Sequence, residues 1–584
     1  MRSRKLIETR LRKLAEILLL LALAACAGGH EVDFARSLAV PAPADLVLRN
    51  GKIITVDRDF SVKQAIAIRD GHFVAVGGDR DVRVLIGKGT RVIDLGGRTV
   101  IPGLIDSHIY ATEAGLTWDD ELHWERTRTL AAGLKQIAAA AETKPPGSWI
   151  VVGGGWVPTQ FAERRFPSRA ELDELAPHHP VYIQYLRDGA LLNSAALTAV
   201  GIKRDTPDPA GGKFERNPST GELSGWLQGV PAWQYAYHKI PRLSLDKVRQ
   251  SIRNCFRELN RLGITSVGDL HTGSVSFAHR RLLAELARSG DLTLRLNFYL
   301  AVDDGGDGVE QLKTAVADIK RLHKSDLFRF AGFSGTFGGG IADGGIMSDP
   351  KDSTITPGTK EMLRQILRLF SGERYVFHLA TPQDNTARQL LDVLEEVNVA
   401  TPLSPQRIAF AHLEDATPET IARIKMLGGG IAVQDRMALT GERTVALWGL
   451  DRARNTPPLR TMIDSGVAMG AGTGAFRSAN YSPMLSLWWL ITGKTVAGSI
   501  IRSQGQNLTR EEALRLYTIG SAWFNFDEGR KGSIEVGKLA DLAVLNADYF
   551  TVAEDQIRLL ESMLTIVGGR IVYAAAPFTQ APRK

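Results

Sequence analysis

The chain has 584 residues, which favours more than one structural unit, and 44% of its residues are hydrophobic and 23% charged. This balance is typical of a globular protein with a large buried core. The net charge is +7, but the basic residues are scattered apart from one N-terminal cluster, and no nucleic-acid-binding motif occurs. We therefore predict no nucleic-acid partner.

The N-terminus has the pattern of an export signal. Basic residues at positions 2–13 precede an apolar run over Ile17–Ala25, which is too short to span a bilayer. Leu23-Ala24-Ala25-Cys26 then resembles a bacterial lipobox, and this resemblance implies cleavage before Cys26 and lipidation of its thiol. The alternative is a chance cysteine after an ordinary cleavage site.

We accordingly predict a lipoprotein signal peptide over 1–25 and a tether over 26–43. The protein would be exported to the bacterial cell envelope and held at the membrane by a lipid on Cys26. Ala27, rather than Asp, follows the cysteine, and the resemblance then implies the periplasmic side of the outer membrane.

Strand-rich segments occur near both ends of the remaining chain. Residues 46–56, 65–77 and 92–101 contain apolar runs broken by Asn-Gly, Asp-Gly and Gly-Gly, which are hairpin signals. Residues 532–545 and 564–573 have a similar pattern. Because each end has few strands of its own, we expect 44–103 and 530–577 to form one small composite β-sandwich.

Between these ends, strands and helices alternate, which is the pattern of a parallel α/β fold. Helices are predicted over 251–262, with Cys255 as a buried small hydrophobe, over 385–397 and 418–427, and after a capping box at Thr509 and Glu512. Residues 112–230 are interpreted as an insertion. The predicted strands cover 263–270, 294–300, 327–333, 374–379, 407–411, 430–434 and 467–470.

The strongest motif is Pro102-Gly103-Leu104-Ile105-Asp106-Ser107-His108, in which a strand delivers a histidine at its C-terminal end. With the further stretches Gly155-Trp156, Phe166–Asp173, Asn193–Leu197, Gly263–Val267 and Gly537–Leu542, the chain resembles the amidohydrolase superfamily, in the branch typified by N-substituted formamide deformylase. The resemblance implies a distorted (β/α)8 TIM barrel over 104–529, a sandwich built from both chain ends, and one or two divalent metals at the C-terminal ends of the barrel strands.

The resemblance also assigns three metal ligands: His108 on the first barrel strand, His378 on the fifth and His412 on the sixth. Each histidine alone would be interpreted as a buried core residue. At the family's positions the ligand interpretation is favoured, and neutral imidazoles suit zinc. We predict one zinc ion with an open position for water or substrate.

Several of the family's functional residues are replaced. The second histidine of the first strand is Tyr110, the fourth-strand lysine is missing from 332–337, and Gly474 stands where the eighth-strand aspartate is expected. Asp188 stands where relatives tend to carry histidine. The missing lysine argues against a carbamate-bridged pair of metals, and the missing aspartate removes the usual proton shuttle of hydrolysis.

Other side chains could take over the proton transfer. Tyr110, Asp188 and Asp269 are the candidate catalytic residues. The alternative for the acids is a solvated or helix-capping role, because that is what loop carboxylates usually do. Further candidates follow other strands or lie in a glycine-rich loop: His271, Asp343, Glu414, Asp415 and Asp435.

Three functions remain open at this point. The first is a one-metal hydrolase acting on non-peptide carbon–nitrogen bonds of the amide type in a small-molecule substrate. The second is a binding protein on a degenerate amidohydrolase fold. The third is metal-independent chemistry with Tyr110 or Asp188 as the proton donor, since a fold does not fix a function.

Two further patterns bear on the site. The glycine triplets 153–155 and 338–340 lack the P-loop and dinucleotide-binding spacings and are interpreted as turns or close-approach loops beside the site. Some of the many tryptophans are expected to line an apolar pocket and others to lie in the core. They are Trp118, Trp124, Trp156, Trp226, Trp233, Trp488 and Trp489.

Overall fold

The computed structural model describes residues 42–579 apart from 271–274, 303–307, 323–324 and 336–353. The predicted signal peptide, the lipidated Cys26, His271, Asp343 and the glycine triplet 338–340 lie outside the described residues. Within the described part of the chain, no helix combines the length and the apolar character needed to cross a membrane.

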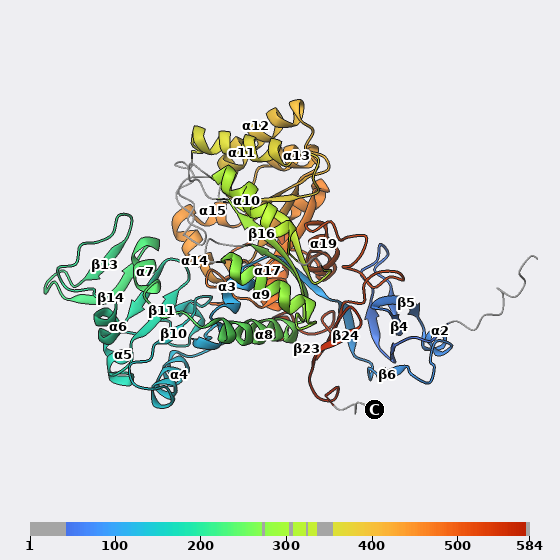
Figure 1. Ribbon diagram of the computed structural model, residues 1–584, viewed down its shortest axis with the longest axis horizontal. Coiled ribbons are helices and arrows are strands. Elements are labelled where there is room, and N and C mark those ends of the chain that lie inside the picture. Colours follow the sequence, from blue (N-terminus) through green and yellow to red (C-terminus); the bar gives the residue numbers. More distant parts are fainter. Residues whose placement is uncertain (1–41, 271–274, 303–307, 323–324, 336–353, 580–584) are drawn as a thin grey trace, which may run out of the picture. The chain divides into compact units, whose positions relative to one another are not determined.

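The centre of the fold is a sheet of eight parallel strands, each paired with the next in chain order (Figure 1). Its two edges also meet, because the Ser107 hydroxyl donates to the Ala471 carbonyl at 2.9 Å and the Gly474 N–H donates to the His108 carbonyl at 2.8 Å. The sheet is therefore a nearly closed barrel, which confirms the predicted fold class. The strands are β8 (Leu104–Ile109), β15 (Ile264–Leu270), β16 (Arg295–Ala301), β17 (Phe328–Gly335), β18 (Val376–Gln383), β19 (Arg407–Asp415), β20 (Gly430–Gln434) and β21 (Ala468–Gly472).

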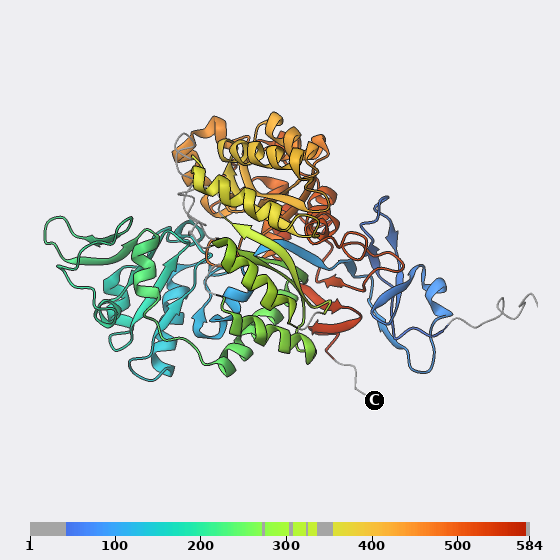
Figure 2. The same cartoon turned by 45° about the horizontal axis from the view of Figure 1, so that its top comes forward.

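Helices cover the outside of the barrel (Figure 2). In β20, Ile431 and Val433 pack into the large apolar cluster shared with these helices, whereas Ala432 belongs to the cluster inside the barrel. This burial on both faces explains why the strands are nearly continuous apolar runs. The helices include α8 (Leu245–Arg261), α9 (Phe277–Arg288), α11 (Pro357–Leu369), α12 (Asp384–Ala400), α13 (Pro418–Met426) and α17 (Pro483–Thr492).

Two predictions about helices are confirmed. Cys255 is fully buried within α8. The helix α18 (Arg510–Arg515) begins with the capping box, in which the Thr509 N–H donates to Glu512 Oε2 at 2.8 Å and the Glu512 N–H donates to the Thr509 hydroxyl at 3.2 Å.

The segment after α19 (Ser521–Trp523) closes the barrel from inside. Phe524 is fully buried in the interior cluster, and its carbonyl accepts a hydrogen bond from the Tyr299 hydroxyl at 2.7 Å. A side chain on Gly470 would place its Cβ 2.6 Å from the Phe524 ring. The glycine in β21 therefore makes room for this aromatic residue.

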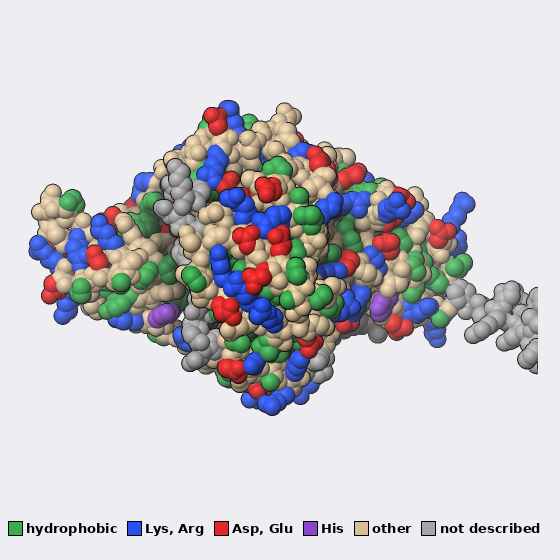
Figure 3. All heavy atoms as spheres, turned by 90° about the horizontal axis from the view of Figure 1, so that it is seen from above, with side chains coloured by type: hydrophobic (Ala, Val, Ile, Leu, Met, Phe, Trp, Pro, Cys, Tyr) green, Lys and Arg blue, Asp and Glu red, His purple; other side chains and the backbone are tan. Residues whose placement is uncertain are grey.

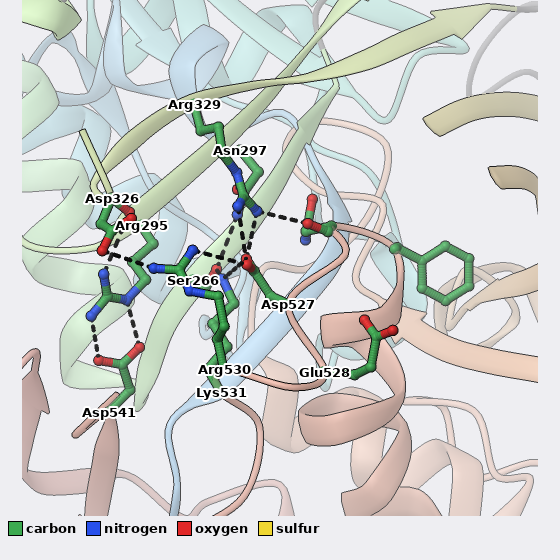
Figure 4. Close-up of polar contacts among 12 residues, drawn as sticks. Ser266, Arg295, Asn297, Asp326, Arg329, Asp527, Glu528, Arg530, Lys531 and Asp541 are labelled. Atoms are coloured by element: carbon green, nitrogen blue, oxygen red, sulfur yellow. Dashed lines mark hydrogen bonds and ion pairs between the residues drawn. The ribbon is translucent and has the colours of Figure 1, made fainter. Parts of the chain in front are cut away.

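Charged side chains fix the same segment to the strand starts (Figure 4). Arg329 of β17 donates to both oxygens of Asp527, at 3.0 and 2.6 Å, and Lys531 lies 3.0 Å from the same carboxylate. Arg295 of β16 is paired with Asp541 at 2.7 Å. In barrels this end serves stability rather than chemistry, so the network is assigned to holding the C-terminal segment in place.

The two ends of the chain form a composite sandwich. In its six-stranded sheet, β7 (Thr99–Pro102) from the N-terminal part pairs with β22 (Leu542–Leu545) from the C-terminal part. The four-stranded sheet contains β5 (His72–Gly77), β4 (Ala65–Arg69), β1 (Leu46–Arg49) and β6 (Arg91–Asp94). One apolar cluster joins the two sheets and contains residues from both ends, as the hairpin signals predicted. The remaining strands of the six-stranded sheet are β2 (Lys52–Ile54), β3 (Val62–Lys63), β23 (Ser562–Val567) and β24 (Arg570–Ala574).

A second six-stranded sheet lies between β8 and β15 in the sequence, within the stretch interpreted as an insertion. It carries helices α4 (Leu130–Thr143), α5 (Arg169–Leu175), α6 (Ser194–Ala199) and α7 (Val230–Tyr237) and has apolar clusters of its own. Trp124 and Trp156 are fully buried in one cluster, so these two tryptophans are core residues. The strands are β9 (Glu121–Leu122), β10 (Ile150–Val152), β11 (Val181–Tyr185), β12 (Gly189–Leu192), β13 (Lys213–Arg216) and β14 (Leu223–Gln228).

The glycine triplet 153–155 joins this insertion to the loop after β21. The Gly155 N–H donates to the Arg477 carbonyl at 3.0 Å, and a Cβ on Gly154 would lie 2.3 Å from the same oxygen. The buried Arg477 side chain reaches back to Gln184 Oε1 at 2.9 Å and the Tyr237 hydroxyl at 2.9 Å. The interpretation of this triplet as a close-approach loop is thus confirmed.

The surface carries no extended field of one sign on the face shown in Figure 3, where Lys and Arg side chains alternate with Asp and Glu. This mixture agrees with the scattered basic residues of the sequence.

Candidate active site

Three buried histidines on three strands of the barrel lie close together. His108 lies on β8, His378 on β18 and His412 on β19. The ring centre of His108 is 5.0 Å from that of His412 and 6.0 Å from that of His378. Three imidazoles bound to one zinc at about 2.0–2.1 Å would have ring centres about 5 Å apart. The structure therefore brings together the three residues that the sequence proposed as ligands.

The environment keeps these imidazoles neutral. Burial, with a smaller contribution from the charges of Arg436 and Arg187, lowers the pKa of His108 to about 3. Burial likewise holds the pKa values of His378 and His412 well below their usual range. Neutral imidazole is the form that binds a metal.

The ring nitrogens also lack other partners. Both nitrogens of His108 and of His378, and Nδ1 of His412, are buried and accept or donate no hydrogen bond in the described part of the chain. An unsatisfied buried polar group costs roughly 1–3 kcal/mol, so a bound ion would relieve several such costs at once. The donor set therefore fits a divalent metal in its chemistry.

The side chains of the three histidines are not arranged around a single point as they would be around a bound metal. Among the described residues, no group of three or more His, Cys, Asp or Glu side chains already converges on one point in metal-binding geometry. Binding would require the histidine rings to rotate toward a common centre.

The backbone at His412 is unusual. His412 has φ +74° and Leu413 has φ +49°, in the left-handed region that residues with a side chain rarely adopt. Such outliers persist only where the surrounding structure enforces them, and they cluster at functional sites. The observation supports a functional role for this end of β19.

Asp106, to which the sequence assigned no role, forms hydrogen bonds beside His108. Its carboxylate accepts hydrogen bonds from the His108 N–H at 3.0 Å and from the Thr473 hydroxyl at 2.7 Å. Burial raises the pKa of Asp106 to about 7. The residue thus ties β8 to the loop after β21 directly behind His108.

Tyr110 lies beside the histidines. Its ring centre is 5.7 Å from that of His108, and the Arg187 guanidinium stands 5.0 Å above its ring. The Tyr110 N–H donates to the Ala475 carbonyl at 2.6 Å. The structure therefore places this candidate catalytic residue at the site, while its role stays a prediction.

The other two candidate catalytic residues have structural partners. Asp188, in the insertion, accepts a hydrogen bond at 2.6 Å from Arg443, which lies in the helix over Met437–Trp448. Asp269 accepts from the Thr112 N–H at 3.1 Å and also from the Thr112 hydroxyl, at the start of α3 (Ala111–Gly115). Their catalytic roles stay predictions as well.

The eighth strand offers no carboxylate at the expected position. Gly474 has φ +65°, and a Cβ there would lie 3.3 Å from the Gln434 side chain. On β17, Ser334 pairs in register with His378. The resemblance implied an aspartate at the position of Gly474 and a lysine within 332–337, the stretch that contains Ser334.

Two arginines near the histidines were not found by sequence reasoning. Arg187 belongs to the insertion, and Arg436 follows β20 and precedes α14 (Met437–Trp448). Arg436 Nη2 donates to Glu414 Oε1 at 2.6 Å, and that oxygen lies 3.9 Å from His412 Nδ1. The signal available for Arg436 was its place just after a barrel strand, where barrel enzymes carry functional groups.

Comparison with known proteins bears on this site. The model of the amidohydrolase family matches residues 91–573. N-substituted formamide deformylase of Arthrobacter pascens is 28% identical over 555 residues, which are 91% of this chain and 98% of the relative. Protein LONG AFTER FAR-RED 3 of Arabidopsis thaliana is 26% identical over 565 residues, covering 92% and 93%.

The fold also matches solved structures. An uncharacterised metal-dependent hydrolase of Pyrococcus horikoshii superposes with a TM-score of 0.64 at 21% sequence identity, over 87% of this chain and 99% of the other. At this identity the match supports the barrel-plus-sandwich architecture.

Proposed function

The chain belongs to the amidohydrolase family, and from this premise we propose that it is a metal-dependent hydrolase of a non-peptide carbon–nitrogen bond in a small molecule. The observation that carries the proposal is the set of three buried, neutral histidines, in which both nitrogens of His108 and His378 and Nδ1 of His412 have no partner in the described part of the chain. N-substituted formamides are the first substrates to test, because a relative that spans nearly the same length is named for them.

His108, His378 and His412 would hold one divalent ion, with zinc favoured by the all-imidazole donor set. When bound, such an ion activates water and polarises the carbonyl of the scissile bond. One ion is favoured over two because Tyr110, directly after β8, stands where the resemblance implies a second histidine, and because β17 contains no lysine.

The residues of the chain would orient and shield the reaction. Asp106 fixes the backbone of His108, and the burial of all three imidazoles keeps bulk water from them. Tyr110 lies where its ring can flank a substrate, under the positive charge of Arg187. Gly474 cannot transfer a proton, so the acid–base step must fall to another group.

A binding protein on the same fold is the second candidate. It is favoured because two residues that the resemblance implies are replaced together: the second histidine of the first strand by Tyr110, and the eighth-strand aspartate by Gly474. This candidate predicts ligand binding without turnover, with or without a metal. Metal-independent chemistry through Tyr110 or Asp188 predicts turnover that chelation leaves unchanged.

Turnover of a panel of N-substituted formamides and other small amides tests the proposal. The purified protein would be assayed as isolated, after treatment with a chelator, and after addition of Zn²⁺. We expect turnover that disappears on chelation and returns with zinc. Turnover that persists unchanged in chelator would contradict the proposal, and binding without any turnover would favour the binding protein.

We further propose that the protein acts in the cell envelope, anchored through lipidated Cys26. Support comes from the basic and apolar pattern of residues 2–25 and the small residues before the cysteine. The Cys26→Ser variant should leave the membrane fraction. Retention of that variant at the membrane would contradict the anchor.

A further inference from the structure

The acid that follows His412 by two residues has the surroundings of a metal ligand. Glu414 is 2% exposed, and its Oε2 has no hydrogen-bond partner in the described part of the chain. Its other oxygen, Oε1, accepts from Arg436 Nη2 at 2.6 Å and from Nε at 3.2 Å. A buried carboxylate is thus held by a cation at one oxygen and presents a second oxygen without a partner.

This carboxylate lies beside one histidine of the cluster, His412. Glu414 Oε1 lies 3.9 Å from His412 Nδ1, and His412 is the ring nearest to His108 among the described ring contacts of that residue. Two donor atoms on one tetrahedral zinc lie about 3.3 Å apart, given metal–ligand distances of about 2.0–2.2 Å. The last torsion of a glutamate rotates easily, so little movement would bring an oxygen into that range.

Among the described residues, the other buried acids near the barrel strands do not lie within ion-pair distance of a site histidine ring. Asp106 accepts hydrogen bonds from His108 N–H and the Thr473 hydroxyl, and Asp269 accepts from Thr112. Asp435 also has a buried oxygen, Oδ1, without a described partner, but no ion pair or hydrogen bond joins its carboxylate to a site histidine in the described part of the chain. Of the acids named here, Glu414 is the one whose carboxylate lies close to the ring of a site histidine, 3.9 Å from His412 Nδ1.

We propose that Glu414 is the fourth protein ligand of the metal, held in place by Arg436, and supplies the carboxylate that the eighth strand lacks at Gly474. The inference rests on the proposed function, because it requires that a metal binds at the three histidines. The resulting site combines three imidazoles and one carboxylate, so the water needed for hydrolysis would be a fifth ligand, a coordination number to which zinc can expand. Arg436 is a positioning residue that orients the carboxylate.

Metal binding can be measured independently of turnover. Full-length wild-type protein and the Glu414→Gln and Asp435→Asn variants would be stripped of metal and titrated with Co²⁺ against a chromophoric chelator. Glutamine keeps an oxygen for Arg436 but loses the charge that a metal prefers. Asp435→Asn is the matched control, since Asp435 is equally buried after the neighbouring strand.

Loss of an outer partner of a metal site already costs about 10–100-fold in affinity, so Glu414→Gln should weaken Co²⁺ binding by about 100-fold or more. It should also change the visible absorption spectrum of the bound Co²⁺, because a ligand has been replaced. Asp435→Asn should bind as the wild type does, and Arg436→Gln should fall between the two. Glu414→Asp keeps the charge on a shorter side chain and should recover part of the affinity, which separates ligation from misfolding.

Two results would overturn the inference in distinguishable ways. Wild-type affinity and an unchanged Co²⁺ spectrum in Glu414→Gln would overturn the role of Glu414 and leave the three-histidine site standing. A folded wild-type protein that binds no Co²⁺ or Zn²⁺ would overturn this inference together with the metal in the proposed function.

Discussion

The buried ion network at the strand starts predicts a large loss of stability when Asp527 is neutralised. Asp527 is 3% exposed and binds Arg329 through both oxygens, while Lys531, which is 1% exposed, lies 3.0 Å away. Asp527→Asn would leave the Lys531 ammonium buried without an anion. Breaking a buried ion pair from one side costs about 3–5 kcal/mol, and that is the expected decrease in the free energy of unfolding.

The effect should depend on pH in a defined direction. The positive charges of Lys531 and Arg329 outweigh burial and lower the pKa of Asp527 from 3.8 to about 2. This lowering corresponds to about 2 kcal/mol of stabilisation, which is present above pH 3.8 and is lost as the pH falls toward 2. The difference between wild type and Asp527→Asn should therefore shrink in acid.

Urea denaturation followed by tryptophan fluorescence would measure these differences, with Glu310→Gln as the control. Glu310 forms an exposed ion pair with Lys313 on α10 (Gly308–Lys320), and its loss should cost less than about 1 kcal/mol. If Asp527→Asn and Glu310→Gln unfolded at the same urea concentration at pH 7, the assignment of the network to stability would be refuted.

Three further predictions follow from single positions. Burial lowers the pKa of Lys531 from 10.5 to about 8, so the lysine loses its proton at a lower pH in the folded state than in the unfolded state. The free energy of unfolding should therefore rise between pH 8 and 10.5. Denaturation at several pH values should show a smaller rise in Lys531→Met. Gly154→Ala should lower the free energy of unfolding by about 1–3 kcal/mol, because the added Cβ would lie 2.3 Å from the Arg477 carbonyl oxygen. Gly89→Ala is the control, because the space around Gly89 is open. Equal melting temperatures of the two variants would refute this prediction. Tyr110→Phe keeps the ring under Arg187 and should retain the wild-type metal content by elemental analysis; loss of metal would place the phenol among the ligands.

The main architecture could be predicted because its signals are local. Apolar runs marked the barrel strands closely: the strand predicted over 263–270 is observed as β15 at Ile264–Leu270. The strand predicted over 374–379 continues as β18 to Gln383, because Thr381 and Gln383 are buried by pairing with β19. Because Thr381 and Gln383 are polar, the apolar run in the sequence ends before the strand does.

The candidate site was predictable only in part. The three histidines lie in apolar strands at the positions that the resemblance implied, so their approach could be expected. The contact of Arg187 with Tyr110 and that of Arg477 with the insertion depend on how a separate sheet docks beside the barrel. The pattern of apolar and polar residues along the sequence does not predict such tertiary contacts. The ion pair of Glu414 with Arg436 could not be predicted for the same reason, because it joins the ends of two different strands.

The metal content of the purified full-length protein, measured by mass spectrometry beside His108→Ala and His378→Ala, tests the central claim most directly. Those two rings lie 6.0 Å apart, and their nitrogens have no other partner among the described residues. The account predicts about one divalent ion per wild-type chain after zinc supplementation, and a clear loss in both variants that remain folded. A folded wild-type chain without metal, or full metal content in both variants, would contradict it.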